Sequence, residues 1–224
     1  MGPEATAEFY KRVIKIIQEK YGARYDYEYP EMIIVNLPIP DIVEDVKNRK
    51  IILKLLKSAL QKLEFLDCDL ISVPCNTINI FFEDMRSYVK IPILNIVEEV
   101  KKEINFFGYK KVVILATNTT IKEGLYEYDS FQAVYPDKGD QKKVNEIILN
   151  IMSGKKPPSD RKSLIKMIRR LYSQGAECVV LGCTELSLIL QKNNTRYKII
   201  DSLNVLAAST IKIAFKEATK NKSM

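Results

Sequence analysis

Histidine is absent from all 224 residues of the chain. Its absence removes the most common general base of enzymes and the most common protein ligand of transition metals. Any acid–base chemistry must therefore be carried by cysteine, aspartate, glutamate, lysine or tyrosine side chains. No stretch approaches the roughly 20 apolar residues that cross a membrane. The first residues, MGPEATAEFYKRV, contain no apolar signal-peptide core. We therefore expect a cytoplasmic protein with no membrane partner.

Cysteine is scarce, with four in the chain. In a cytoplasmic protein these residues are expected to be free thiols rather than disulfides. Cys68 and Cys75 are separated by 7 positions and Cys178 and Cys183 by 5, which does not match the short two-cysteine spacing of zinc knuckles. No metal site is predicted. Cys68 and Cys178 lie at the starts of predicted strands, where cysteine acts as a small core residue.

The charge is unbalanced, with 35 Lys and Arg against 28 Asp and Glu, a net charge of +7. This excess allows either a nucleic-acid surface or a field that attracts small anions. The lysines are spread along helical stretches such as KLLKSALQK, and no nucleic-acid motif accompanies them. The pattern favours an ordinary solvated surface and no nucleic-acid partner.

Apolar patterns alternate along the chain between helical and strand periodicity. MIIVNLP, DLISVP, KKVVILAT and CVVLG are short apolar runs of the kind that form buried strands. Amphipathic stretches at 4–20, 45–65, 139–153 and 161–174 separate several of the runs. This alternation predicts an α/β fold, with parallel sheets flanked by helices.

The order of elements occurs twice, at 50–105 and at 161–218, and each copy places a cysteine after a strand. The cysteine of the first copy is Cys75, in VPCNTINIFF, and the cysteine of the second copy is Cys183, in LGCTELSLIL. In the second half of the chain the strand KVVILAT precedes a segment, TIKEGLY, which resembles ATAEFY near the start of the chain. Nothing comparable precedes ATAEFY, so we expect either a start assigned too late or a first strand that is lost or substituted.

Two cysteines at equivalent strand ends suggest paired acid–base chemistry. Ligands of open α/β sheets bind at these ends, and a following helix N-terminus lowers a thiol pKa and donates N–H groups to a carboxylate. If the two copies face each other, one thiolate can remove an α-proton while the other thiol protonates the opposite face. Near-attack contacts would place the sulfur atoms about 7 Å apart. Asn76, Thr77, Thr184 and backbone amides are candidates to stabilise the developing charge.

At these residues the sequence resembles the aspartate/glutamate racemase family, in its aspartate racemase branch. The resemblance rests on PCNTIN and GCTEL and extends through MGPEATAEFY, LATNTTIKEGLYE, YPDKGDQKKVNEIILNIMSG, GAECVVLGCTELSLIL and YKIIDSLNVLA. It implies a cofactor-independent racemase that binds a small anionic amino acid between two pseudo-symmetric domains and forms a homodimer. We expect residues 1–97 with 205–224 to form the domain that carries Cys75, and residues 98–204 the domain that carries Cys183.

The resemblance also assigns roles to individual positions. Cys75 and Cys183 match the acid–base pair. The positions that match substrate-binding residues are Asn76, Thr77, Thr117, Thr120, Thr184, Glu185, Met1 and Gly2.

Three departures leave the substrate open. Asn79 stands where the family commonly has histidine, and Ile42 where aspartate racemases commonly carry an arginine. Met152 or Ser153 replaces an expected lysine before Gly154. Aspartate is the first substrate to consider. A racemase or isomerase for glutamate, a hydantoin or a dicarboxylic acid is an alternative, and so is a non-catalytic binder of small anions.

Overall fold

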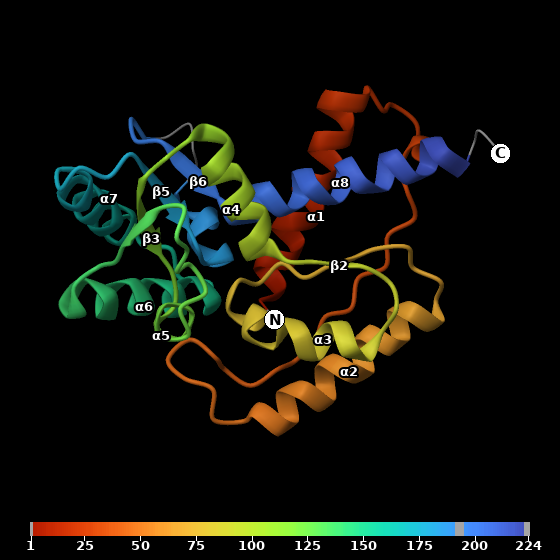
Figure 1. Cartoon of the computed structure of the whole chain (residues 1–224), viewed down its shortest axis with the longest axis horizontal. Helices are drawn as coiled ribbons and strands as arrows, with labels where there is room; N and C mark the ends of the chain where they lie inside the picture. The colour runs from red at the N-terminus through yellow and green to blue at the C-terminus, as the bar shows by residue number, and fades with distance from the viewer. Residues whose placement is uncertain (1, 191–194, 222–224) are drawn as a thin grey trace.

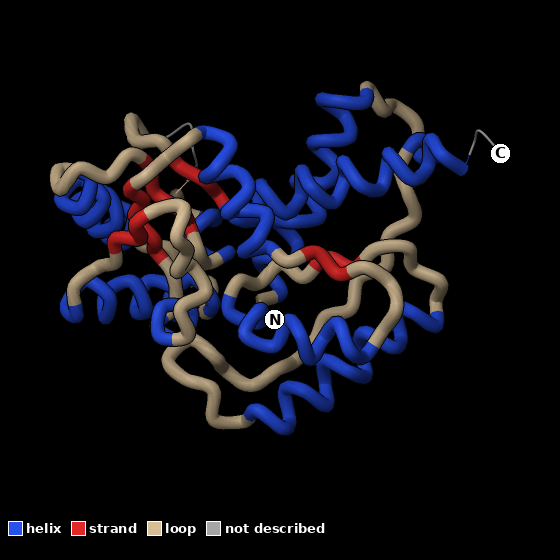
Figure 2. Tube along the Cα trace, viewed as in Figure 1, coloured by secondary structure: helices blue, strands red, loops and turns tan. Residues whose placement is uncertain are grey.

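The computed structural model describes residues 2–190 and 195–221, and in this part of the chain strands form two parallel sheets (Figures 1 and 2). The larger sheet has the order β4-β3-β5-β6, and the smaller sheet pairs β1 with β2. The strands are β1 (Ile71–Ser72), β2 (Ile93–Leu94), β3 (Lys111–Leu115), β4 (Gln132–Val134), β5 (Cys178–Leu181) and β6 (Ile199–Asp201). The predicted α/β fold class is therefore confirmed.

Helices surround both sheets. The α-helices are α1 (Pro3–Tyr21), α2 (Arg49–Phe65), α3 (Phe82–Tyr88), α4 (Ile96–Phe107), α5 (Asn118–Lys122), α6 (Lys138–Met152), α7 (Pro158–Tyr172) and α8 (Ser202–Asn221). Short 3₁₀-helices are η1 (Asp26–Glu28), η2 (Thr77–Phe81) and η3 (Thr184–Leu188). Local signals explain several of these limits: Pro3 opens α1, Gly22 ends it in the left-handed conformation, and the Asn95 side chain caps the first N–H groups of α4.

The larger sheet is covered on both faces, which explains its continuous apolar runs. Alternate residues of the central strands point to opposite sides. Val113, Leu115, Val179 and Leu181 pack against the apolar faces of α6 and α7. Val112, Ile114, Cys178 and Val180 pack against α4 and α8 on the other side. The prediction that Cys178 is a core residue is confirmed.

The smaller sheet has a separate core. Ile71 packs there with the buried face of α2 and with α3, as Figure 1 shows in the lower part of the molecule. Helices α1 and α8 cross above it, where Val13 and Ile17 meet Ala207 and Ile211. Among the described residues, no helix combines the length and the apolar character needed to cross a membrane.

The buried strand predicted for MIIVNLP is wrong. Residues 30–42 form no strand, and Ile33 and Ile34 are 39% and 53% exposed. A strand needs a hydrogen-bonding neighbour, and β1, the nearest candidate in this half, pairs only with β2. The prediction of a core position for Cys68 is also wrong, because its side chain is partly exposed. The helix expected over 184–192 is the shorter η3 within the described residues, and residues 191 and 192 lie outside them.

Candidate active site

Cys75 and Cys183 lie just beyond the carboxyl ends of β1 and β5, and each precedes a 3₁₀-helix. The two strand ends meet across the boundary between the sheets. The hydroxyl oxygen of Thr184 lies 3.4 Å from the backbone carbonyl oxygen of Pro74, and the two thiols are close enough for each to feel the charge of Glu185. The fold therefore brings together two cysteines that are separated by about half of the chain.

Glu185 is the polar partner of Cys183. The Cys183 thiol donates to Oε2 of Glu185 at 3.0 Å, and the Thr184 hydroxyl donates to the same oxygen at 3.1 Å. Burial raises the pKa of Cys183 well above its ordinary value, and the neighbouring carboxylate raises this pKa further. Cys183 is therefore a thiol at neutral pH in the ligand-free protein.

The surroundings of Cys75 contain groups that raise the pKa of its thiol and groups that lower it. Burial and then the charge of Glu185 raise the pKa of Cys75 to about 11, while backbone N–H groups of Ile78 and Thr77 point at the sulfur and oppose this rise. These N–H groups belong to the first turn of η2, which begins two residues after Cys75. The thiolate forms of both cysteines are thus costly unless a ligand adds positive charge or displaces the carboxylate.

Three threonine hydroxyl groups form a closed triangle. Thr77 Oγ1 lies 2.9 Å from Thr117 Oγ1 and 3.0 Å from Thr120 Oγ1, and the hydroxyl groups of Thr117 and Thr120 are 2.9 Å apart. Thr117 also caps α5 by accepting from the backbone N–H of Thr120. All three side chains are buried. They come from both halves of the fold, so the triangle offers a compact set of neutral donors beside the first cysteine motif.

Asn76 is held by a chain of hydrogen bonds that the sequence did not reveal. Its Nδ2 donates to Ser202 Oγ at 2.9 Å, and Ser202 donates to the carbonyl of Leu181 at 2.7 Å. On its other side, Tyr126 donates to Asn76 Oδ1 at 2.6 Å. Tyr126 is fully buried, and no periodic pattern in its segment marked it as a site residue.

The amino end of α1 also reaches the site. A Cβ atom on Gly2 would lie 2.4 Å from Oε1 of Glu185, so this position requires a residue without a side chain or a shift of the carboxylate. Met1, which was predicted to bind substrate, lies outside the described residues. Arg12 on the same helix donates to Asp201 at 2.6 Å, with 13% and 9% of the two side chains exposed. Sequence patterns did not identify this ion pair.

The structure shows what Asn79 and Ile42, two of the departures from the family pattern, contact. Asn79 Nδ2 donates to the backbone carbonyls of Cys75 and Asn76, so it stabilises the first cysteine turn. Ile42 is buried in the apolar cluster of the first half, and the next residue, Val43, accepts from the backbone N–H of Thr119 at 3.2 Å. An uncharged side chain thus occupies a position next to the threonine loop.

No lysine occupies the end of α6, where one was expected. Met152 and Ser153 are exposed there. Lys156, a little further along the chain, forms an ion pair with Glu4 in the first turn of α1. The ammonium group of Lys156 is therefore already paired.

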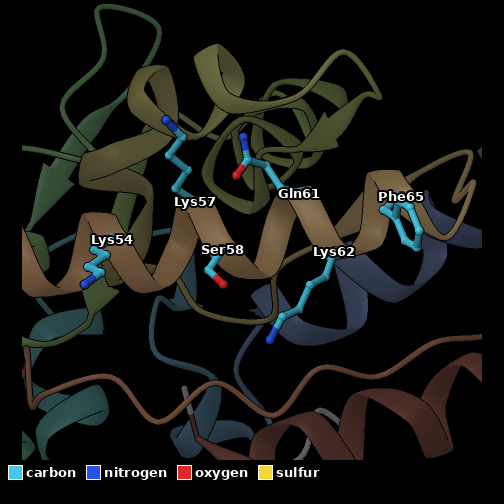
Figure 3. A pocket seen from close by; sticks show the side chains of 6 residues that line it. All are labelled: Lys54, Lys57, Ser58, Gln61, Lys62 and Phe65. Atoms are coloured by element: carbon cyan, nitrogen blue, oxygen red, sulfur yellow. The ribbon is translucent and has the colours of Figure 1, made fainter.

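Other surfaces are poorer candidates. A hollow of about 460 Å³ lies beside α2. Its lining residues, drawn in Figure 3, are Lys54, Lys57, Ser58, Gln61, Lys62 and Phe65. All six residues come from one helix, so the hollow is the solvated lysine face expected from the sequence. Within the described ranges, no three His, Cys, Asp or Glu side chains are grouped in a way that could hold a metal ion.

Comparisons with known proteins point to one family. The family model described as "Asp/Glu/Hydantoin racemase" matches residues 1–210. The chain is 33% identical over 218 residues to the broad specificity amino-acid racemase RacX of Bacillus subtilis (strain 168), covering 94% of this chain and 93% of that protein.

Solved structures show the same likeness. The aspartate racemase of Picrophilus torridus is 26% identical with a TM-score of 0.82, covering 95% of this chain and 90% of that one. An aspartate racemase homologue from Pyrococcus horikoshii OT3 is also 26% identical, with a TM-score of 0.73 and coverage of 95% and 94%.

Proposed function

Because the chain belongs to the Asp/Glu/hydantoin racemase family, we propose that it racemises amino acids without a cofactor, using Cys75 and Cys183 as its acid–base pair. The observation that carries the proposal is the meeting of two cysteines at equivalent strand ends beside one carboxylate, Glu185. In a chain without histidine, these thiols are the groups at the site best suited to proton transfer from carbon.

In the proposed reaction one cysteine enters as thiolate and the other as thiol. The thiolate takes the α-proton, so an S–H bond forms as the C–H bond breaks and the electron pair is delocalised into the substrate carboxylate. The second thiol then gives its proton to the opposite face of the α-carbon and becomes the thiolate. The reverse direction exchanges the two roles, which fits a site built from two similar halves.

Substrate binding has to lower the pKa of one of the two cysteines so that it becomes a thiolate. Burial and Glu185 hold both pKa values high in the free protein. An α-ammonium group bound beside Glu185 would neutralise this carboxylate and so lower the pKa of both thiols. The substrate carboxylate would take donors from the hydroxyl groups of Thr77, Thr117 and Thr120, replacing bonds that they now make with one another.

Two kinds of amino acid are candidate substrates: aspartate, with a side-chain carboxylate, and amino acids with an uncharged side chain. Aspartate follows from the family resemblance and from the aspartate racemases among similar structures. Uncharged amino acids are favoured by Ile42, since an apolar group beside the threonine loop leaves a second carboxylate unpaired there. The broad specificity of the RacX relative agrees with the second candidate.

The test is incubation of the purified protein in deuterated water, without cofactor, with L-aspartate and with a panel of neutral L-amino acids. Exchange of the α-proton and formation of the D-isomer are followed together. Deuterium incorporation with inversion supports the two-thiol reaction, and the ratio of aspartate to neutral rates selects between the candidate substrates. Ligand-induced thermal stabilisation without exchange on any substrate of the panel would instead show a small-anion binder and reject the racemase.

A further inference from the structure

Segment 41–44, which precedes α2, joins the two halves of the molecule beside the threonine loop, residues 117–120 (Figure 1). Two adjacent side chains of the segment lie in different cores. Ile42 packs in the core of the smaller sheet, whereas Val43 belongs to the core between the larger sheet and helices α6 and α7. The carbonyl oxygen of Val43 accepts from the backbone N–H of Thr119 at 3.2 Å and from the Thr119 hydroxyl at 3.3 Å. The segment therefore holds the threonine loop from the side of the first half.

Asn145, on α6, connects this segment to the threonine loop a second time. Its Nδ2 donates to Oε1 of Glu44 at 2.8 Å, and its Oδ1 accepts from the backbone N–H of Asn118 at 3.2 Å. Gln141, one turn earlier on the helix, donates to the same Oδ1 at 3.0 Å and to the carbonyl of Ala116 at 2.9 Å. Asn145 is 3% exposed. A backbone N–H only donates and a carboxylate only accepts, so the orientation of the Asn145 amide is fixed.

These contacts determine how the amino end of α5 lies. The first N–H groups of a helix have no partner within it, so partners from outside fix its direction. The N–H of Asn118 donates to Asn145, the next N–H donates to segment 41–44, and the N–H of Thr120 donates to the hydroxyl of Thr117 at 3.1 Å. Two of the three hydroxyl groups of the threonine triangle therefore take their places from the contacts of Asn145.

We propose that Asn145 is a positioning residue for the substrate carboxylate, because it fixes where Thr117 and Thr120 present their hydroxyl groups. This role rests on the racemase activity proposed above. Asn145 acts through Asn118 and Glu44 rather than by touching the substrate. Its loss should raise KM more than it lowers kcat, and it should leave the thiolate transitions of the two cysteines in place.

The first test compares Asn145→Ala with Asn150→Ala. Both asparagines lie on α6, and each donates from Nδ2 to a carboxylate at 2.8 Å, Asn145 to Glu44 and Asn150 to Asp160. Asn145→Ala is expected to raise KM by about tenfold, the effect of one misplaced hydrogen bond to the carboxylate. Asn150→Ala should leave KM unchanged even where it lowers the free energy of unfolding. An unchanged KM in Asn145→Ala, or an equal rise in both variants, would overturn the proposal.

An exchange of the two partners tests the contact with Glu44. Asn145→Asp places two carboxylates face to face and removes the donor between them, so KM should rise at least as much as in Asn145→Ala. Glu44→Gln keeps an acceptor for Asn145 and should resemble the unaltered protein. In the double variant the new amide donates to the new carboxylate, which still accepts from Asn118 and Gln141, so KM should recover most of the loss. A double variant no better than Asn145→Asp would overturn the assignment.

Hydrogen–deuterium exchange of the ligand-free protein, followed by NMR, separates this role from the proposed activity. Asn145→Ala should speed exchange of the backbone N–H groups of residues 118–120, because their partners are lost or loosened, whereas Asn150→Ala should not. Absence of turnover in the unaltered protein on every amino acid of the panel would reject the racemase. Equal exchange at residues 118–120 in the two variants would reject the positioning role whatever the activity.

Discussion

The thiol of Cys183 donates its hydrogen to Oε2 of Glu185 across 3.0 Å, and this carboxylate also raises the pKa of Cys75. One negative charge therefore acts on both halves of the candidate acid–base pair. For a cysteine, a raised pKa means that the thiol persists to higher pH and that the thiolate forms only in alkaline solution. The folded protein should accordingly resist alkylation at these two residues until the pH is well above the ordinary cysteine range.

Glu185→Gln is predicted to shift the thiolate transition of both cysteines to lower pH. Burial still raises the two pKa values, but the carboxylate charge and its acceptance of the Cys183 thiol hydrogen are removed. The measurement is the alkylation rate of Cys75 and Cys183 against pH without substrate, which does not depend on turnover. Glu146→Gln, at an exposed glutamate paired with Lys143, is the control and should leave both profiles in place. Unchanged profiles in Glu185→Gln would contradict the assigned role.

Single cysteine variants should separate proton exchange from inversion. With Cys75→Ala, Cys183 still faces one side of the α-carbon, so one enantiomer should exchange its α-proton without forming the other. Cys183→Ala should do the same for the opposite enantiomer. Racemisation is expected to fall by at least about 10²-fold in each variant, the range for loss of a general acid or base.

Cys68→Ala is the control for these variants because Cys68 precedes β1, is partly exposed and takes no part in the candidate site. Its racemisation rate should match that of the unaltered protein. Full racemisation by either Cys75→Ala or Cys183→Ala would reject the two-thiol reaction.

Tyr126→Phe is predicted to destabilise the fold and loosen Asn76. The change leaves the buried Oδ1 of Asn76 without the hydroxyl that now donates to it at 2.6 Å. An unpaired buried acceptor costs about 1–3 kcal/mol, which should appear as a lower free energy of unfolding in urea. Substrate KM should rise if Asn76 orients the carboxylate.

Tyr135→Phe is a control that is not expected to destabilise the fold. The Tyr135 hydroxyl is buried and has no hydrogen-bond partner among the described residues, so its removal should leave stability unchanged or raise it. A loss of stability as large in Tyr135→Phe as in Tyr126→Phe would show that the hydrogen bond to Asn76 is not the cause.

Arg12→Met tests the ion pair that joins α1 to the end of β6. Both side chains are largely buried, so the loss of the cation leaves Asp201 with only its bonds from Ser187 and the first N–H groups of α8. The expected cost is about 3 kcal/mol in the free energy of unfolding. Arg86→Met removes an exposed partner of Glu83 and should cost less than about 1 kcal/mol. Similar losses in the two variants would mean that burial of the Arg12 pair is unimportant.

The sequence alone determined the local elements and the position of the cysteines. The runs KVVIL and CVVL became the central strands because residues that are apolar on both faces are stable only inside a covered sheet. Pro3 and Asn95 set helix starts through local backbone geometry and capping. The repeat of strand, cysteine and threonine placed Cys75 and Cys183 at equivalent strand ends without any knowledge of distant contacts.

Tertiary structure decided everything that depends on a partner far along the chain. MIIVNLP has the composition of a strand but remains outside the sheet, because a strand requires a hydrogen-bonding neighbour and β1 pairs only with β2 among the described residues. Cys68, in the turn before β1, is partly exposed. Tyr126 and Arg12 became important only through contacts with Asn76 and Asp201, residues 50 and 189 positions away. Hydrogen bonds of this kind leave no periodic pattern, since they depend on where the folded chain brings two side chains rather than on their spacing.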